Sequence, residues 1–228
     1  DPEMSRGLGD VYKRQAYGRP LISYYLYGKI SLENIGYRPA DFYQKNGVTL
    51  LTGVCADKID AEEKKVYLRN GKKLAYDKLL VATGSRPFIP PMDGMDTVPE
   101  KFTFMRLDDA LALEKSLSPD KSVLIVGAGL IGLKCMEGVL DRVKSVTVVD
   151  MANRILPSIL DEEGASLVQS ELESRGVRFY LNDSVAKFQK NTAFTKSGKT
   201  LDFDILVVAV GVRPNVELVN CLLYTSDA

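Results

Sequence analysis

The stretch SVLIVGAGLIG (122–132) points to the fold more directly than any other part of the chain. A short apolar run predicts a buried strand, and three glycines follow it at GxGxxG spacing: Gly127, Gly129 and Gly132. The first glycine permits a tight turn, the second leaves space for a pyrophosphate, and the third lets a helix pack closely on the strand. The N–H groups of that helix's first turn, at Leu130 and Ile131, are suited to phosphate. The motif alone is weak, but its position between a strand and a helix predicts a dinucleotide-binding turn.

An acidic residue stands where such a site needs one. Asp150 follows the next predicted strand, VTVV (146–149), 18 residues beyond Gly132. A carboxylate there can accept hydrogen bonds from ribose hydroxyls and would repel a 2′-phosphate, which favours NADH over NADPH. Arg154 lies close by in the sequence and weakens that preference, either as a ligand contact or as a solvated surface charge.

Strands and helices alternate around this motif. A helix is expected over Leu130–Arg142, and a second over Glu162–Arg175 that stops at Gly176. VRFYL (177–181) predicts a further strand, as do VTLL (48–51) and KLLVA (78–82) earlier in the chain. Strand–helix–strand alternation indicates parallel βαβ units.

An internal repeat indicates two domains of one type. VYLRNGKKLAYDKLLVATGSRP (66–87) and AFTKSGKTLDFDILVVAVGVRP (193–214) align without a gap at an offset of 127 residues. Each copy predicts a hairpin around a turn at Asn70-Gly71 or Ser197-Gly198, then a buried strand, then a Gly-x-Arg-Pro exit. The expected fold class is therefore α/β, with two Rossmann-like dinucleotide-binding domains and small antiparallel hairpin or meander insertions.

We expect the first domain over 16–100 and the second over 101–220, joined by the Pro- and Gly-rich segment 87–100. The second carries the glycine motif and is nearly complete. The first lacks its own GxGxxG, so it is expected to be a partial domain whose missing βαβ unit would precede Ala16.

The two ends of the chain have the character of adapter DNA translated into protein. DVYKRQ (10–15) and CLLYTS (221–226) can be encoded by opposite strands of one short DNA element, which resembles the transposase adapter used in sequencing libraries. Residues 1–15 and 221–228 are therefore interpreted as non-native tails and left out of functional reasoning. The natural protein is expected to continue past both.

Composition excludes several classes of function. Thirty basic and thirty acidic residues give no net charge and no basic cluster, which argues against nucleic-acid binding. Histidine is absent, which removes Ser-His-Asp and Cys-His catalysis and most zinc sites, so no catalytic or metal residue is assigned. No stretch is long and apolar enough for a membrane helix, and there is no secretory signal. Cysteines at 55, 135 and 221, without CxxC spacing, favour a reduced, cytoplasmic setting.

The chain resembles the pyridine nucleotide–disulfide oxidoreductase superfamily over essentially all of 16–220. The markers are RPLISYYLYGKI (19–30), YDKLLVATG (76–84), GAGLIG (127–132) and FDILVVAVG (203–211). More narrowly, it is similar to the flavoproteins of NADH:rubredoxin reductases and to the FAD-binding part of NADH-dependent nitrite reductases. The resemblance implies FAD and NAD(P)H as cofactors, with one domain for each.

The same resemblance implies which residues hold the cofactors. Arg19 and Pro20 would contact FAD, and the backbone of Ala56 would touch its adenine. Ala82, Thr83 and Gly84 would close around the FAD pyrophosphate and ribose, and Gly211 would approach the nicotinamide nucleotide. The family often has Glu where this chain has Lys134. A cation there either favours a reduced, anionic flavin or faces solvent.

Three functions remain open at this point. The first is an NAD(P)H oxidoreductase that passes hydride to FAD and electrons on to a rubredoxin-like carrier or a downstream reductase domain, without a redox cysteine. The second is a cysteine-dependent NADH oxidase or coenzyme A–disulfide reductase. No cysteine lies in 16–30, where such relatives carry it, and Cys55 and Cys135 are expected to be buried and inert. The third is a dinucleotide-binding fragment without turnover.

Overall fold

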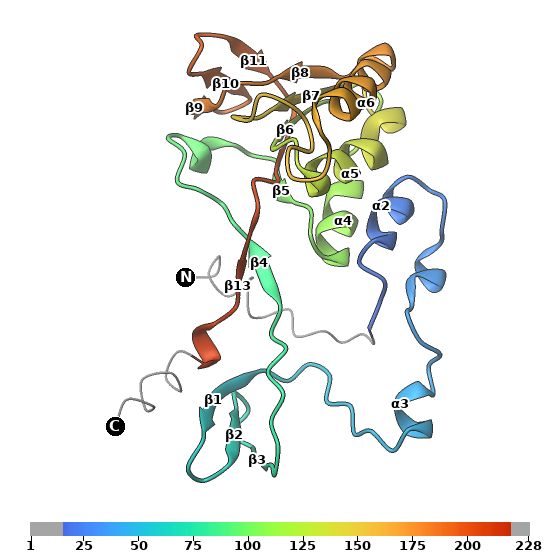
Figure 1. Ribbon diagram of the computed structural model, residues 1–228, viewed down its shortest axis with the longest axis vertical. Coiled ribbons are helices and arrows are strands. Elements are labelled where there is room, and N and C mark those ends of the chain that lie inside the picture. Colours follow the sequence, from blue (N-terminus) through green and yellow to red (C-terminus); the bar gives the residue numbers. More distant parts are fainter. Residues whose placement is uncertain (1–15, 220–228) are drawn as a thin grey trace. The chain divides into compact units, whose positions relative to one another are not determined.

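A computed structural model describes residues 16–219, so both adapter-like tails lie outside the described residues. The described chain divides into two compact units, each treated separately below (Figure 1). Unit 1 contains 16–17, Gly36–Arg86 and 213–219, and unit 2 contains Gly18–Ile35 and Pro87–Val212. This division places 87–100 in unit 2 instead of ending the first part at residue 100, and it also places Gly18–Ile35 in unit 2.

Unit 2 is built on a five-stranded parallel sheet in the order β5-β12-β6-β7-β8. The strands are β5 (Lys101–Thr103), β6 (Ser122–Val126), β7 (Ser145–Val149), β8 (Arg178–Tyr180) and β12 (Ile205–Val208). Helix α5 (Leu130–Val139) with the 3-10 turn η3 (Leu140–Arg142) joins β6 to β7, and α6 (Glu162–Ser174) joins β7 to β8. These elements confirm the strands and helices predicted around the glycine motif.

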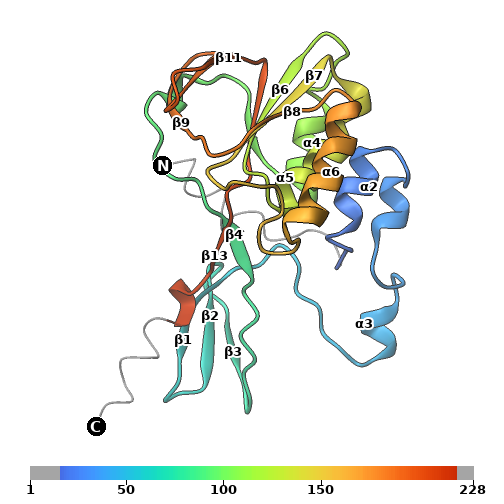
Figure 2. The same cartoon turned by 45° about the horizontal axis from the view of Figure 1, so that its top comes forward.

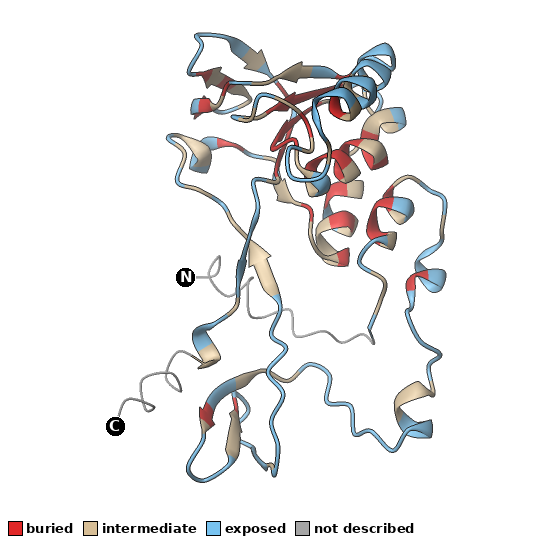
Figure 3. Ribbon diagram, viewed as in Figure 1, coloured by how far each residue is buried: buried red, intermediate tan, exposed pale blue. Residues whose placement is uncertain are grey.

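The sheet is covered on both faces, which explains its near-continuous apolar strands. Helices α4 (Leu107–Glu114), α5 and α6 lie on one side of the sheet (Figure 2). The antiparallel meander of β9 (Val185–Gln189), β10 (Thr192–Thr195) and β11 (Thr200–Asp202) lies on the other. Alternate residues of β6 serve the two faces, and Leu124 and Val126 join the core beneath the meander with Phe188 and Ala193. Buried residues concentrate on these central strands and on the inner faces of the helices (Figure 3).

Helix α2 (Leu21–Leu26) packs against α4 and α5 within unit 2, and the 3-10 turn η1 (Leu32–Ile35) follows it. Leu26 is completely buried, and a Cβ built at Gly138 of α5 would lie 3.1 Å from its Cβ and Cδ2 atoms. The Tyr25 hydroxyl donates to Glu114 Oε2 at 2.6 Å, and Arg142 Nη1 donates to the Leu26 carbonyl at 2.8 Å. The missing side chain at 138 therefore allows a close helix crossing, and polar contacts hold it.

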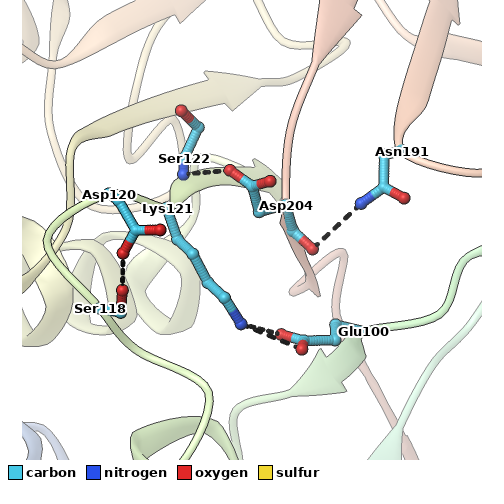
Figure 4. A network of polar contacts seen from close by, with 7 residues as sticks. All are labelled: Glu100, Ser118, Asp120, Lys121, Ser122, Asn191 and Asp204. Atoms are coloured by element: carbon cyan, nitrogen blue, oxygen red, sulfur yellow. Dashed lines mark hydrogen bonds and ion pairs between the residues drawn. The ribbon is translucent and has the colours of Figure 1, made fainter.

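Asp204 ties the start of β12 to the start of β6 (Figure 4). Its carboxylate accepts a 2.7 Å hydrogen bond from the Ser122 N–H, and its own N–H donates to the Ser122 carbonyl at 2.8 Å. Lys121 and Glu100 form an ion pair of 3.0 Å beside this contact. The network stands at the amino ends of the parallel strands, opposite the glycine turn, and gives the repeated Asp a structural role in the second copy.

Unit 1 contains a second antiparallel meander, formed by β1 (Ala56–Asp60), β2 (Lys65–Leu68) and β3 (Lys73–Ala75). Helix α3 (Phe42–Lys45) precedes it. The predicted strands at 48–51 and 78–82 are wrong, because the structure has no strand at either position. Leu80 is 89% exposed, and these segments have no neighbouring strand among residues 16–219 to satisfy their backbone groups. The α/β class, with one parallel sheet and antiparallel meanders, is confirmed.

The Gly-x-Arg-Pro segments that end the two repeat copies pair with each other. Strands β4 (Ser85–Pro87) and β13 (Val212–Pro214) form a two-stranded ribbon (Figure 1). The Phe88 N–H donates to the Gly211 carbonyl at 2.9 Å, and the Asn215 N–H donates to the Gly84 carbonyl at 2.9 Å. The repeat offset of 127 relates Gly84 to Gly211 and Phe88 to Asn215, so the two bonds are equivalents of each other. The repeat seen in the sequence is thus also a local two-fold symmetry of the backbone.

Candidate dinucleotide-binding site

The carboxyl edge of the unit 2 sheet brings together the residues predicted to bind a dinucleotide. Gly127 follows β6, Asp150 follows β7, and Gly211 lies three residues beyond β12. The Gly127 N–H donates to the Val149 carbonyl at 2.8 Å, which holds the start of the glycine turn against the neighbouring strand. In open parallel sheets, ligands bind at the carboxyl ends of the strands.

The three fingerprint glycines are required for different reasons. Gly127 has a φ of +117°, and a Cβ there would fall on the Ala209 carbonyl oxygen. A Cβ on Gly132 would fall on the Gly127 carbonyl oxygen. A Cβ on Gly129 would meet no heavy atom within 4 Å. The first and third glycines therefore allow the backbone to pack, while the second faces the open space that a pyrophosphate would fill.

Gly129 is also the N-cap of α5 and, having no side chain, offers no capping oxygen. The N–H groups at Leu130 and Ile131 in the first turn are therefore left for a ligand, together with the partial positive charge of the helix end. Leu130 is 54% exposed at this terminus. Chemically, this end of the helix is suited to an anion such as a pyrophosphate.

Asp150 is bound to the glycine turn itself. Its Oδ2 accepts a 2.5 Å hydrogen bond from the Ala128 N–H, and its Oδ1 accepts a 2.7 Å bond from the Ala152 N–H. A carboxylate oxygen can accept more than one hydrogen bond, so the group can still receive a ribose hydroxyl. Asp150 thus orients the turn and remains able to contact a ligand.

Arg154 faces its own loop. Its Nε and Nη2 atoms lie 3.4 Å from the carbonyls of Leu160 and Pro157, which are long contacts. The guanidinium is half-buried among these carbonyls and beside the polar face of α6. Arg154 is therefore a half-buried loop contact rather than a fully solvated surface charge, and a contact with a ligand stays a prediction.

The residues expected to hold FAD come from both units. Arg19 and Pro20 are exposed at the start of α2 in unit 2, whereas Ala56, Ala82, Thr83 and Gly84 belong to unit 1. The Thr83 hydroxyl donates to the Asn215 carbonyl at 2.6 Å, and Asn215 Nδ2 donates to the Thr83 carbonyl at 2.9 Å. Their roles toward FAD remain predictions.

The predicted burial holds for Cys135 and not for Cys55. Cys135 is completely buried in α5, and burial raises the pKa of its thiol far above the usual range. Cys55 is half-buried. No group of three His, Cys, Asp or Glu residues suited to a metal ion occurs within the described range 16–219. Over the same range, no helix has the length and apolar character needed to cross a membrane.

Lys134 does not simply face solvent. Its ammonium forms a 2.7 Å ion pair with Glu137 and lies 5.4 Å from the centre of the Tyr24 ring on α2. Its effect on a flavin is untested. The contact nevertheless connects the helix that begins at the fingerprint with the segment expected to meet FAD.

Two contributors to the site were not found from the sequence. The first is Ala209, whose carbonyl leaves no room for a side chain at 127. The repeat could have identified Ala209, since it aligns with the candidate Ala82. Leu156 donates its N–H to the Ala128 carbonyl at 2.9 Å. No sequence pattern indicates Leu156, because the contact depends on its backbone alone.

Comparison with known proteins agrees with this geometry. A family model described as pyridine nucleotide-disulphide oxidoreductase matches residues 8–226. The assimilatory nitrate reductase electron transfer subunit of Bacillus subtilis is 35% identical over 206 residues, which is 89% of this chain and 27% of that protein. The NADH oxidase of Methanocaldococcus jannaschii is 34% identical over 217 residues, 90% of this chain and 48% of that protein.

Among solved structures, a ferredoxin reductase from Rhodopseudomonas palustris superposes with a TM-score of 0.85 at 27% identity. The match covers 92% of this chain and 53% of that one. The chain is thus much shorter than these relatives, since it spans 27% of the Bacillus subtilis subunit and 48% of the Methanocaldococcus jannaschii oxidase.

Proposed function

Because the chain belongs to the pyridine nucleotide-disulphide oxidoreductase family, we propose that it is the nicotinamide-binding part of an FAD-dependent NADH oxidoreductase. The observation that carries the proposal is the open Gly129 beside the α5 N-terminus, with Asp150 at the same sheet edge. In such an enzyme the bound nicotinamide supplies a hydride and the bound flavin accepts it.

The roles of the chain's own residues follow from their geometry. The first-turn N–H groups of α5 and the space at Gly129 bind a pyrophosphate, and Asp150 accepts a ribose hydroxyl. The absence of histidine suits hydride transfer, which depends on positioning more than on proton movement. Arg19, Pro20, Ala56, Ala82, Thr83 and Gly84 are proposed to contact FAD, and Gly211 the nicotinamide nucleotide.

We propose a redox carrier, such as rubredoxin or ferredoxin, or a fused reductase domain as the electron acceptor. The support is that one relative is named an electron transfer subunit and one structural neighbour a ferredoxin reductase. The burial of Cys135 supports a route without a thiol. A cytoplasmic location is proposed with it, since Cys55 and Cys135, the cysteines among residues 16–219, are both free, which suits a reducing compartment.

Anaerobic titration of the full-length protein with NADH tests this function. We expect the flavin absorbance to bleach without a charge-transfer band and to return when an oxidised carrier is added. Iodoacetamide should leave the rate unchanged. Flavin that stays oxidised in excess NADH would contradict the proposal.

A second candidate is thiol-dependent NADH oxidase chemistry, which the relative named NADH oxidase favours. It predicts a stable charge-transfer band after reduction and loss of turnover on alkylation. These two readouts separate it from the carrier-dependent function.

A further inference from the structure

The loop between β7 and α6 contains a residue in a strained conformation. Leu156 has a φ of +47°, in the left-handed region that side chains with a Cβ rarely adopt. Three other non-glycine residues of the described chain share this conformation: Lys64, Asn182 and Lys190. Lys64 and Lys190 stand in tight turns between antiparallel strands. Leu156 is the one bulky apolar residue among the four, and its Cβ makes this conformation unfavourable.

The strained backbone directs an N–H group onto the glycine turn. Leu156 donates to the Ala128 carbonyl at 2.9 Å, while the Ala128 N–H donates to Asp150 at the other end of the same loop. Ala128 is completely buried. This one loop satisfies both of its polar backbone groups, the N–H through Asp150 and the carbonyl through Leu156. Ile155, also completely buried, anchors the loop beside Leu156.

We propose that Leu156 is a positioning residue that presets the fingerprint turn for a dinucleotide. Its left-handed backbone, rather than its side chain, holds the Ala128 carbonyl back from the space beside Gly129. The turn then keeps its binding conformation before the ligand arrives, so binding does not have to order it. The inference rests on the proposed function, because the ligand is a dinucleotide only if that function holds.

The test compares two variants of the 228-residue chain, with NAD⁺ as the probe and calorimetry as the readout. Leu156→Gly keeps the N–H and tolerates a positive φ, so the Kd should stay within about two-fold of the original. Leu156→Pro removes the N–H and fixes φ near −65°, so the Kd should rise at least about ten-fold. If Leu156 acted through packing alone, Leu156→Gly would instead raise the Kd for NAD⁺, because the side chain is lost.

Lys190 provides a matched control. It has a φ of +51°, and its N–H donates to Thr97 Oγ1 at 3.0 Å, in a turn between β9 and β10. Lys190→Pro should lower the melting temperature and leave the Kd for NAD⁺ unchanged. This separates damage to a left-handed turn in general from damage to the fingerprint turn.

Hydrogen exchange of the ligand-free chain decides the question if Leu156→Pro does not fold. The Leu156 amide should exchange at least about ten-fold more slowly than the amides of exposed loop residues such as Met151. Rapid exchange at Leu156 would overturn the proposal. So would a folded Leu156→Pro that binds NAD⁺ normally, or a Leu156→Gly that binds as weakly as Leu156→Pro. If the unaltered chain fails to bind NAD⁺, the proposed function fails, while the exchange result still reports whether the turn is preset.

Discussion

At the scale of single residues, substitution of Gly129 is expected to change ligand binding, and substitution of Gly132 is expected to change the stability of the fold. A methyl group at 129 has open space, so Gly129→Ala should cost less than about 1 kcal/mol of stability. The same methyl would occupy the proposed pyrophosphate space, so the Kd for NAD⁺ should rise at least about ten-fold. Gly132→Ala should instead lower the free energy of unfolding by about 1–3 kcal/mol, because its Cβ meets the Gly127 carbonyl. Urea denaturation and calorimetry on both variants measure this, and equal effects of the two would refute it.

Asp150 makes a structural contact and is proposed to select the nucleotide as well. In the unaltered chain, both carboxylate oxygens of Asp150 accept hydrogen bonds from backbone N–H groups. In Asp150→Asn, an amide nitrogen replaces one of these oxygens and would face a backbone N–H. The variant should lose about 1.5–3 kcal/mol of stability, the range for hydrogen bonds to a charged group. Loss of the negative charge also removes repulsion of a 2′-phosphate, so the ratio of NAD⁺ to NADP⁺ affinity should narrow. Calorimetry with both nucleotides checks this, and an unchanged ratio would exclude Asp150 from selecting the nucleotide.

Asp183 gives the meander β9–β11 a pH-dependent contact. Burial raises the pKa of its carboxyl, but hydrogen bonds from Ser197, Thr195 and Ser184 outweigh this, so the pKa lies below its usual value. A lowered pKa stabilises the fold above the unfolded-state value of about 3.9, and that stability is lost as the pH falls through the folded-state pKa. Ser197→Ala, which removes the 2.5 Å bond to Oδ2, should therefore cost about 1 kcal/mol at pH 7, and the difference should shrink between pH 7 and pH 3 as Asp183 begins to take up a proton. Thermal unfolding at the two pH values is the measurement, and a pH-independent difference would contradict it.

At the scale of elements, the crossing of α2 with α5 depends on Gly138. Gly138→Val would push its side chain into Leu26 and should lower the free energy of unfolding by about 1–3 kcal/mol. Amide exchange in Leu21–Leu26 should become faster than in the unaltered chain, since α2 loses its packing surface. Tyr25→Phe, which removes only the bond to Glu114, should cost about 1 kcal/mol and leave α2 in place. Unchanged exchange in Gly138→Val would mean that α2 is held by other contacts.

The two repeat copies show where sequence-based prediction of elements succeeded and failed. Residues 205–208 form the predicted buried strand, β12, which pairs with β5 and β6, while the equivalent 78–82 segment forms no strand. Both copies have the same local apolar pattern, so the difference does not come from local preference. A strand needs neighbours to satisfy its N–H and C=O groups, and a pattern within one segment cannot report whether those neighbours are present.

The sequence could indicate those candidate site residues whose role depends on their side chain or on its absence. Gly127, Gly129, Gly132 and Asp150 are specified by side chain, or by the lack of one, and the spacing identified them. Leu156 contributes a backbone atom, which any residue carries, so the sequence contained no signal specific to it. Ala209 also acts through its backbone, and only its alignment with Ala82 in the repeat could have indicated it. The placement of Gly18–Ile35 with unit 2 was missed for a related reason, since it depends on tertiary contacts of Leu26 that local patterns do not encode.

For the molecule as a whole, the two nucleotides should behave differently toward this chain. The residues proposed for NAD⁺ lie together at one sheet edge in unit 2, and that sheet has its helices and meander in place. Among the residues proposed for FAD, Ala82 and Thr83 follow a segment, 79–81, that is exposed rather than paired in a sheet. The 228-residue chain should therefore bind NAD⁺ and retain far less than stoichiometric FAD after incubation and gel filtration. Absorbance at the flavin band and calorimetry with NAD⁺ on the same sample measure both. A yellow chain with one FAD per molecule would show that the FAD residues assemble without a paired strand at 78–82, and the argument from exposed strands would fail.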